Sequence, residues 1–147
     1  MTIALREVTK ENLRDIFKLK VAPDQERFVA PNAVSIAQAY FDRDVAWFRG
    51  IYADDTPIGF VMLHDDPAER KYYLWRFMIV HRFQGKGYGA QALEAVIAYV
   101  RQRPGAQEFL TSVVPGEGTP GPFYEKLGFV YTGEMEEAER VMRKVLG

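Results

Sequence analysis

Three closely spaced glycines mark the stretch of this sequence that is best suited to bind a phosphate group. They lie in His81-Arg82-Phe83-Gln84-Gly85-Lys86-Gly87-Tyr88-Gly89, between an apolar run and an amphipathic run. A glycine-rich turn in front of a helix offers free backbone N–H groups and the positive end of the helix dipole, and both favour phosphate or pyrophosphate. Arg82 and Lys86 add positive charge there. We therefore predict a phosphate site, although such glycines are also typical of a tight turn without a ligand.

Two nucleotide-binding motifs fit this stretch less well. Gly85-x-Gly87-x-x-Ala90 matches the dinucleotide fingerprint, which makes a nicotinamide-dependent oxidoreductase one alternative. That fingerprint requires an acidic residue at the end of the next strand, and residues 109–114 (FLTSVV) contain none. The P-loop of mononucleotide-binding proteins requires Lys-Ser or Lys-Thr after a glycine, and this stretch has neither.

Strand and helix patterns alternate along the chain, and they place the glycines between a strand and a helix. A helix over residues 87–101 follows them, with Gly89, Leu93, Val96, Ile97 and Val100 as its buried stripe. The predicted strands cover residues 3–8, 45–52, 58–63, 72–80, 109–114, 129–135 and 140–146, and a last short helix covers 123–127. The order β-α-α-β-β-β-α-β-α-β-β predicts one mixed α/β domain over residues 1–147.

Two short helices are predicted between the first and second strands. Thr9 can cap the first of them, which would bury one apolar face made of Leu13, Ile16 and Phe17. A loop over residues 24–30 follows. Ser35 can cap the second helix, whose predicted buried side chains are Ile36, Ala39 and Tyr40.

The composition narrows the classes of function. The chain has 147 residues, of which 48% are hydrophobic, and 19 basic against 20 acidic side chains, which argues against a general nucleic-acid binder. It has no cysteine, so a thiol nucleophile and a cysteine-based metal site are excluded. His64 and His81 do not suggest a metal site. We find no secretory signal and no membrane-spanning run, and expect a cytoplasmic protein without a membrane partner.

Two motifs resemble those of the GNAT family of N-acetyltransferases. Gln84-Gly85-Lys86-Gly87-Tyr88-Gly89 has the form Q-x-x-G-x-G and resembles the family's acetyl-CoA pyrophosphate loop. Phe123-Tyr124-Glu125-Lys126-Leu127-Gly128-Phe129 is similar to the family's F/Y-Y-x-x-x-G-F segment. Within the family, the chain looks most like bacterial spermidine/spermine acetyltransferases, in residues 76–79, 84–87, 127–129 and 133–142.

The resemblance implies a fold, a co-substrate and a set of site residues. The implied fold is a single α/β domain of the α+β type, with a mixed, mostly antiparallel sheet of about seven strands and about four helices. Acetyl-CoA would be the co-substrate, with no metal. The backbone of Met78, Ile79 and Val80 would contact the pantetheine arm. The pyrophosphate would be held by Gln84, Gly85, Lys86, Gly87, Tyr88, Gly89 and Ala90.

Tyr124 corresponds to the family's tyrosine that protonates the departing CoA thiolate. A thiol of pKa about 8.5 and a phenol of pKa about 10 make this transfer nearly balanced. A primary amine of pKa about 10.4 must also lose a proton, at a cost of about 4–5 kcal/mol at pH 7. We therefore expect a carboxylate, or a water chain that ends at one, on the acceptor side.

The chain departs from the polyamine-type sequences on that acceptor side. Trp75 stands where those sequences have an acid, and it could stack on a substrate cation or simply pack in the core. Glu117 replaces an asparagine that usually contacts CoA, and Pro120 replaces an alanine. Glu26 and Glu117 are the candidate replacements for the missing carboxylate, and both are also typical of plain surface residues.

These observations favour acetyl transfer from acetyl-CoA to the primary amine of a small molecule, with a polyamine suggested by resemblance. The acceptor could also be an amino acid, an antibiotic amine or a protein N-terminus. A catalytically silent acyl-CoA-binding or regulatory domain of the same fold is a further alternative. Members of the fold often pair, so a homodimer is possible.

Overall fold

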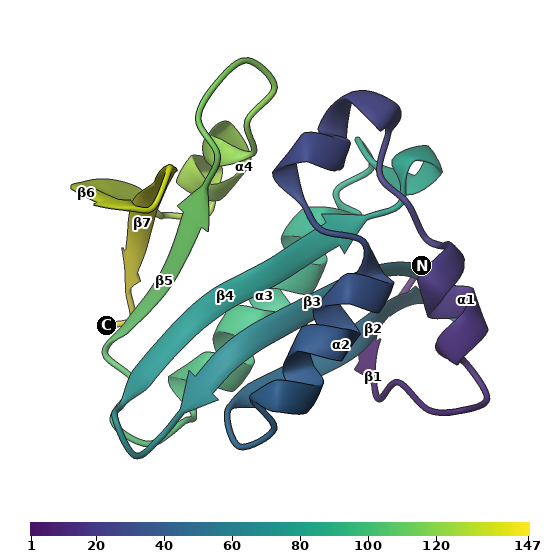
Figure 1. The fold of residues 1–147 in the computed structure, drawn as a ribbon, viewed down its shortest axis with the longest axis horizontal. Helices are drawn as coiled ribbons and strands as arrows, with labels where there is room; N and C mark the ends of the chain where they lie inside the picture. The colour runs from purple at the N-terminus through teal and green to yellow at the C-terminus, as the bar shows by residue number, and fades with distance from the viewer.

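The computed structural model describes residues 1–147 as one seven-stranded sheet with helices on both faces (Figure 1). The strand order is β1-β2-β3-β4-β5-β7-β6, and every neighbouring pair is antiparallel except β4–β5. The strands are β1 Ile3–Arg6, β2 Ala46–Ala53, β3 Thr56–Asp66, β4 Lys71–Ile79, β5 Glu108–Val113, β6 Val130–Glu136 and β7 Glu139–Val145. The helices are α1 Leu13–Lys18, α2 Asn32–Phe41, α3 Tyr88–Arg101 and α4 Gly121–Lys126, with 3₁₀ helices η1 Pro23–Phe28 and η2 His81–Phe83. The predicted element order and the mostly antiparallel sheet are confirmed.

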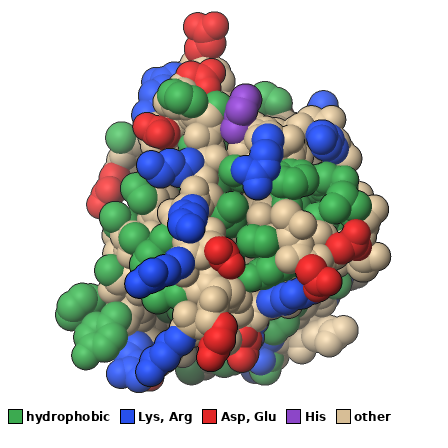
Figure 2. Space-filling model, turned by 90° about the vertical axis from the view of Figure 1, so that its right-hand side faces the viewer, with side chains coloured by type: hydrophobic (Ala, Val, Ile, Leu, Met, Phe, Trp, Pro, Cys, Tyr) green, Lys and Arg blue, Asp and Glu red, His purple; other side chains and the backbone are tan.

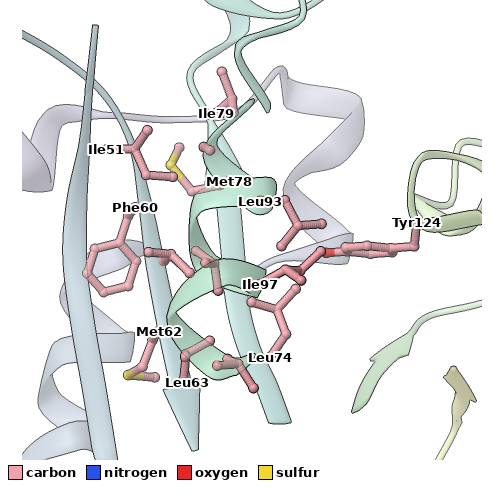
Figure 3. Close-up of a cluster of buried hydrophobic side chains, with 14 of the residues drawn as sticks. Ile51, Phe60, Met62, Leu63, Leu74, Met78, Ile79, Leu93, Ile97 and Tyr124 are labelled. Carbon is pink, nitrogen blue, oxygen red and sulfur yellow. The ribbon is translucent and has the colours of Figure 1, made fainter. Parts of the chain in front are cut away.

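The core lies where both faces of the central strands are covered. Phe60, Val61, Met62 and Leu63 of β3 are consecutive and fully buried, as expected of a strand with helices on both sides. Helix α3 packs on one face of the sheet through a stripe spaced at helical period, and α1 and α2 cover the other face (Figures 1 and 3). The stripe consists of Ala92, Leu93, Val96, Ile97 and Val100.

The pairing of β4 with each of its neighbours changes at Trp75. In the ladder with β3, Met62 pairs with Arg76 and Leu63 pairs with Leu74, so Trp75 is an extra residue in a β-bulge. In the ladder with β5, only Tyr73–Leu110 and Leu74–Thr111 are paired. The two strands diverge beyond this point, and Figure 1 shows the resulting gap between the ribbons of β4 and β5. The rest of β4 therefore has a free edge on the β5 side.

The first short helix differs from its predicted form. It begins after Asn12, whose side chain accepts a hydrogen bond from the Thr9 N–H at 2.7 Å and donates one to the Glu7 carbonyl at 3.0 Å. Thr9 is therefore not the cap. Ile16 is fully buried, whereas Phe17 is 40% exposed, because a six-residue helix presents only one narrow face to the sheet.

The second short helix begins three residues before its predicted cap. Pro31 precedes α2, since its fixed φ suits the start of a helix. Ser35 lies inside the helix, is fully buried, and donates from Oγ to the Pro31 carbonyl. Tyr40 was predicted to be buried but is 63% exposed. The predicted loop over residues 24–30 is mostly the 3₁₀ helix η1.

The surface carries charges of both signs. Viewed from the side of α1, basic and acidic side chains are interspersed with exposed hydrophobic groups (Figure 2). None of the helices combines the length and the hydropathy needed to cross a membrane.

Candidate active site

A cavity of about 830 Å³ lies where β4 and β5 diverge. Its walls come from η1, the second half of β4, the glycine turn, the start of α3, the end of β5 and α4. The predicted site residues that line it are Glu26, Trp75, Met78, Ile79, Gln84, Gly85, Gly87, Gly89, Ala90 and Tyr124. The predicted residues that do not line it are Val80, Lys86, Tyr88 and Glu117. The structure thus brings together residues from distant parts of the chain at one cavity.

The glycine turn presents unpaired N–H groups to this cavity. Gly85 and Gly87 have φ of +75° and +83°, a conformation that side chains with a Cβ rarely adopt. The N–H groups of residues 85–87 donate to no backbone carbonyl, and the first bond of α3 runs from the Gln91 N–H to the Gly87 carbonyl. The N–H groups of residues 88–90 therefore have no acceptor within the helix. This turn offers an anion several donors at a helix N-terminus.

Gly89 was predicted to belong to the buried stripe of α3, but it is only half-buried. A Cβ on Gly89 would meet its nearest neighbour, Phe123, at 3.5 Å, which is an ordinary contact. The packing of α3 on the sheet therefore does not require a glycine there. Ala92 takes its place in the buried stripe.

The two cations beside the turn are free to face an anion. Arg82 and Lys86 are exposed, and neither takes part in an ion pair. Both stand over the ring of Phe83, at 5.1 Å and 5.7 Å from its centroid. The ring keeps both positive groups close to the turn.

The side chain of Gln84 joins three elements. Its Nε2 donates to the Ile79 carbonyl at 2.8 Å and to Oε1 of Gln25 at 2.9 Å. The amide of Gln25 donates back to Oε1 of Gln84 at 3.0 Å. This pair ties η1 to the end of β4 and to the glycine turn. Sequence reasoning missed Gln25 because no motif marks a partner that lies 59 residues away.

Tyr124 reaches the cavity from α4 and is only 6% exposed (Figure 3). Its ring makes edge contacts with Phe123 and Phe129, with centroids 5.3 Å and 5.6 Å apart. Burial raises the pKa of Tyr124, and the neighbouring Thr111 hydroxyl opposes that rise. The phenol therefore stays protonated at neutral pH. It is also a weaker acid than an ordinary tyrosine, so its proton transfer to a thiolate is less balanced than ordinary pKa values predict.

Hydrogen bonds hold η1 and the loop before α4 together on one side of the cavity. The guanidinium of Arg27 on η1 donates to the Glu117 carbonyl at 2.7 Å, in the loop between β5 and α4. The Thr119 hydroxyl donates to the Val114 carbonyl at 2.7 Å and fixes the start of that loop. Glu117 thus contributes its backbone to the structure, while its side chain is exposed outside the cavity.

A second cavity, of about 500 Å³, adjoins the first towards the start of β4. Four residues line both cavities: Trp75, Arg76, Ser112 and Glu139. The second cavity is rich in carboxylates, namely Asp42, Glu136, Glu137 and Glu139, beside His64, Lys71 and Tyr73. Sequence reasoning did not identify it, because its walls come from separate elements whose register no motif reveals.

Arg76 is a half-buried cation at the junction of the two cavities. Its guanidinium donates to the Trp75 carbonyl and to Oε1 of Gln38, both at 3.0 Å, and its buried Nε has no partner. Burial lowers the pKa of Arg76, and the charge of Glu139 opposes the change. Since no carboxylate forms an ion pair with Arg76, its charge remains available at the junction.

The chain matches known proteins over nearly its whole length. The profile of the acetyltransferase (GNAT) family matches residues 7–129. The chain is 26% identical over 155 residues to the spermine/spermidine N(1)-acetyltransferase of Bacillus subtilis (strain 168), an alignment that covers 99% of this chain and 100% of that protein.

Two solved structures share the fold. An acetyltransferase from Thermus thermophilus is 20% identical, has a TM-score of 0.78, and is aligned over 99% of this chain and 98% of its own. The PaiA N-acetyltransferase from Thermoplasma acidophilum, in complex with coenzyme A, is 20% identical with a TM-score of 0.71, over 99% of this chain and 100% of its own.

Proposed function

This chain belongs to the acetyltransferase (GNAT) family and is an acetyl-CoA-dependent acetyltransferase, and from that premise we propose that it acetylates the primary amine of a small molecule, a polyamine in the first instance. The observation that carries the proposal is the cavity between β4 and β5, which has free N–H donors at one end and adjoins the carboxylate-rich second cavity at the other. Such a cavity suits an anionic co-substrate that meets a cationic acceptor.

The co-substrate would lie along the free edge of β4. Pairing with β5 stops at Leu74, so the following residues of β4 have no strand partner on that side. Side chains already bond to two of their carbonyls, those of Trp75 and Ile79. We assign the pantetheine arm to the backbone of Met78 and Ile79, because the amide groups of the arm can hydrogen-bond to a strand edge. The expected contact with Val80 is not proposed, since Val80 does not line the cavity and its N–H donates to the Ile58 carbonyl at 2.7 Å. The pyrophosphate is assigned to the N–H groups between Gln84 and Ala90, where the helix N-terminus favours negative charge.

The transfer would be a direct attack without a covalent enzyme intermediate. The neutral amine nitrogen attacks the thioester carbonyl, a C–N bond forms, and the C–S bond breaks. The thiolate that leaves takes a proton from the Tyr124 hydroxyl, which burial keeps protonated. The amine gives up one proton, so a base is needed on the acceptor side.

Two observations favour a polyamine among the possible acceptors. The curated relative from Bacillus subtilis is a spermine/spermidine acetyltransferase. Carboxylates from β6, β7 and the end of α2 surround the acceptor end of the site, as a polycation would require. Trp75 is half-buried and lines both cavities, so it can stack on a substrate cation there.

A thiol-release screen with acetyl-CoA tests this function. The panel contains spermidine, spermine, amino acids, aminoglycosides and peptides with a free N-terminus, and spermidine or spermine should give the highest kcat/KM. Thiol release with a different class of amine only would show that this class, and not a polyamine, is the acceptor. Binding of CoA without thiol release from any amine would support a silent acyl-CoA-binding domain, and retention of NAD instead of CoA would support the oxidoreductase.

A further inference from the structure

Two carboxylates line the larger cavity, and their surroundings differ. Glu26 lies on η1 and is exposed. Glu139 is the first residue of β7, is half-buried, and also lines the second cavity. Of the two, only Glu139 therefore stands where the co-substrate end and the acceptor end of the site meet.

The carboxylate of Glu139 is only partly compensated. Its Oε1 accepts a hydrogen bond from the Ser112 hydroxyl at 3.0 Å, which fixes the side chain against β5. No donor is bonded to its other oxygen, and none of the four ion pairs of the chain includes it. Arg76 also lines both cavities, and the charge of Glu139 acts on its pKa, but no ion pair joins the two side chains. The free oxygen of Glu139 can therefore accept a hydrogen bond from an ammonium group.

The remaining carboxylates of the second cavity are less suited to proton transfer. Glu136 is exposed and accepts a hydrogen bond from the Tyr73 hydroxyl at 2.9 Å. Asp42, Glu136 and Glu137 do not line the larger cavity, where the thioester would lie. They are therefore separated from the reacting carbonyl, whereas Glu139 borders both spaces.

We propose that Glu139 is the catalytic base, which binds the protonated acceptor amine and takes one of its protons, so that the neutral amine can attack the thioester. This inference rests on the proposed function. The ammonium group has no lone pair, so its first proton goes to the free oxygen of Glu139 before the C–N bond forms. The nitrogen loses a second proton after the attack, and this proton returns to Tyr124 once Tyr124 has donated its own. The C–S bond breaks, and the thiolate takes a proton from Tyr124. The products are the amide, the free thiol and protonated Glu139, which releases its proton to solvent.

Glu139→Gln tests the inference without removing the local structure. The glutamine oxygen can still accept the hydrogen bond from Ser112, and the side chain keeps its shape. With the preferred amine, kcat/KM at pH 7 should fall by about 10²–10⁴-fold, as expected for the loss of a positioned base. The affinity for CoA and the melting temperature should stay unchanged. Glu134→Gln, an exposed carboxylate of β6 outside both cavities, should behave as wild type.

The pH profile separates proton transfer from a merely structural role. Wild type binds the ammonium form and removes its proton on the enzyme, so its kcat/KM should change little between pH 7 and 9. The variant must use the neutral amine from solution, so its kcat/KM should rise about tenfold per pH unit below the amine pKa of about 10.4. The defect of Glu139→Gln should shrink accordingly. Glu139→Asp should restore part of the activity at pH 7.

Two results would overturn the inference while leaving the function intact. In the first, Glu139→Gln keeps the wild-type kcat/KM with an amine that wild type acetylates. In the second, the variant loses the same factor at pH 7 and at pH 9. A wild-type chain that binds CoA but releases no thiol with any amine would refute the proposed function and the base together.

Discussion

Burial gives the Tyr124 hydroxyl two properties that oppose each other. Its raised pKa keeps the proton in place at neutral pH, as a general acid requires, but it also weakens proton donation. A thiolate that leaves beside Tyr124 would be destabilised by the same apolar surroundings, so the pKa of that thiol would rise as well. What matters is the difference between the two pKa values, and a shared environment changes that difference less than either value alone.

Tyr124→Phe should lower kcat by about 10²–10⁴-fold, because the leaving thiolate loses its proton donor. The phenylalanine ring keeps the edge contacts with Phe123 and Phe129, so the fold and the CoA affinity should be preserved. Thiol release together with calorimetric titration of CoA measures both quantities. Full activity in this variant would dismiss Tyr124 as the acid.

Gly87→Asp should weaken CoA binding by more than about 100-fold, since a carboxylate would face the pyrophosphate at the helix N-terminus. Gly133→Asp is a matched control. Gly133 also has a left-handed φ, of +88°, and open space around it, but it lies on β6 away from the cavity. Both variants should lose similar stability in thermal melts, and only the first should lose CoA affinity. Equal CoA affinities in the two variants would show that the glycine turn does not bind CoA.

At the scale of secondary-structure elements, the site depends on how β4 departs from its neighbours. The bulge at Trp75 allows consecutive side chains of β4 to face both cavities, and the early end of pairing with β5 opens the space. β-Bulges commonly redirect side chains next to active sites. The close fit of β3 against β4 then fixes the position of the free edge.

Gly59→Ala tests that fit. A Cβ on Gly59 would come within 2.3 Å of the Met78 carbonyl oxygen, and a backbone atom cannot rotate away. We expect a loss of about 1–3 kcal/mol in the free energy of unfolding, as for other overpacked sites, and weaker CoA binding because Met78 must shift. Urea denaturation measures the first effect. Gly89→Ala, whose Cβ meets only ordinary contacts, is the control for stability, and a Gly59→Ala protein as stable as wild type would contradict the argument.

The parts of the site that could be predicted from the sequence are the local ones. The glycine turn and Tyr124 lie in short motifs next to strongly periodic elements, so both their types and their placement are visible in a few residues. The Gln25–Gln84 pair and Glu139 depend on contacts across the chain, and the bulge depends on a one-residue offset in a ladder. No local pattern encodes such an offset. The N-cap positions Asn12 and Pro31 were missed because Thr9 and Ser35, which lie nearby in the sequence, are of residue types that commonly cap helices.

For the whole molecule, several tyrosines make stability depend on alkaline pH. Burial raises the pKa of Tyr73 and of Tyr99 to about 12, and hydrogen bonding to Glu136 and Asp65 adds to the shift. In the unfolded chain these phenols lose their protons near pH 10. Between about pH 10 and 12 the folded state therefore binds more protons than the unfolded state, so stability falls as the pH rises through this range.

The urea midpoint of unfolding should thus be constant near pH 8 and should decrease progressively above pH 10. Tyr99→Phe should show a shallower decrease, because one of the shifted groups is gone, although it loses the hydrogen bond to Asp65 at every pH. Denaturation monitored by circular dichroism across this pH range provides the measurement. Parallel curves for wild type and variant above pH 10 would show that Tyr99 does not contribute.

The narrow seam between β4 and β5 also governs how the two portions of the sheet hold together. Only two residue pairs and the bond from the Thr111 hydroxyl to the Leu74 carbonyl join these strands. A molecule bound in the gap, with contacts to β4 on one side and to α4 on the other, would connect the two portions of the sheet. Binding of such a molecule would therefore also join the two portions of the sheet, and the protein without it would be the less stable form.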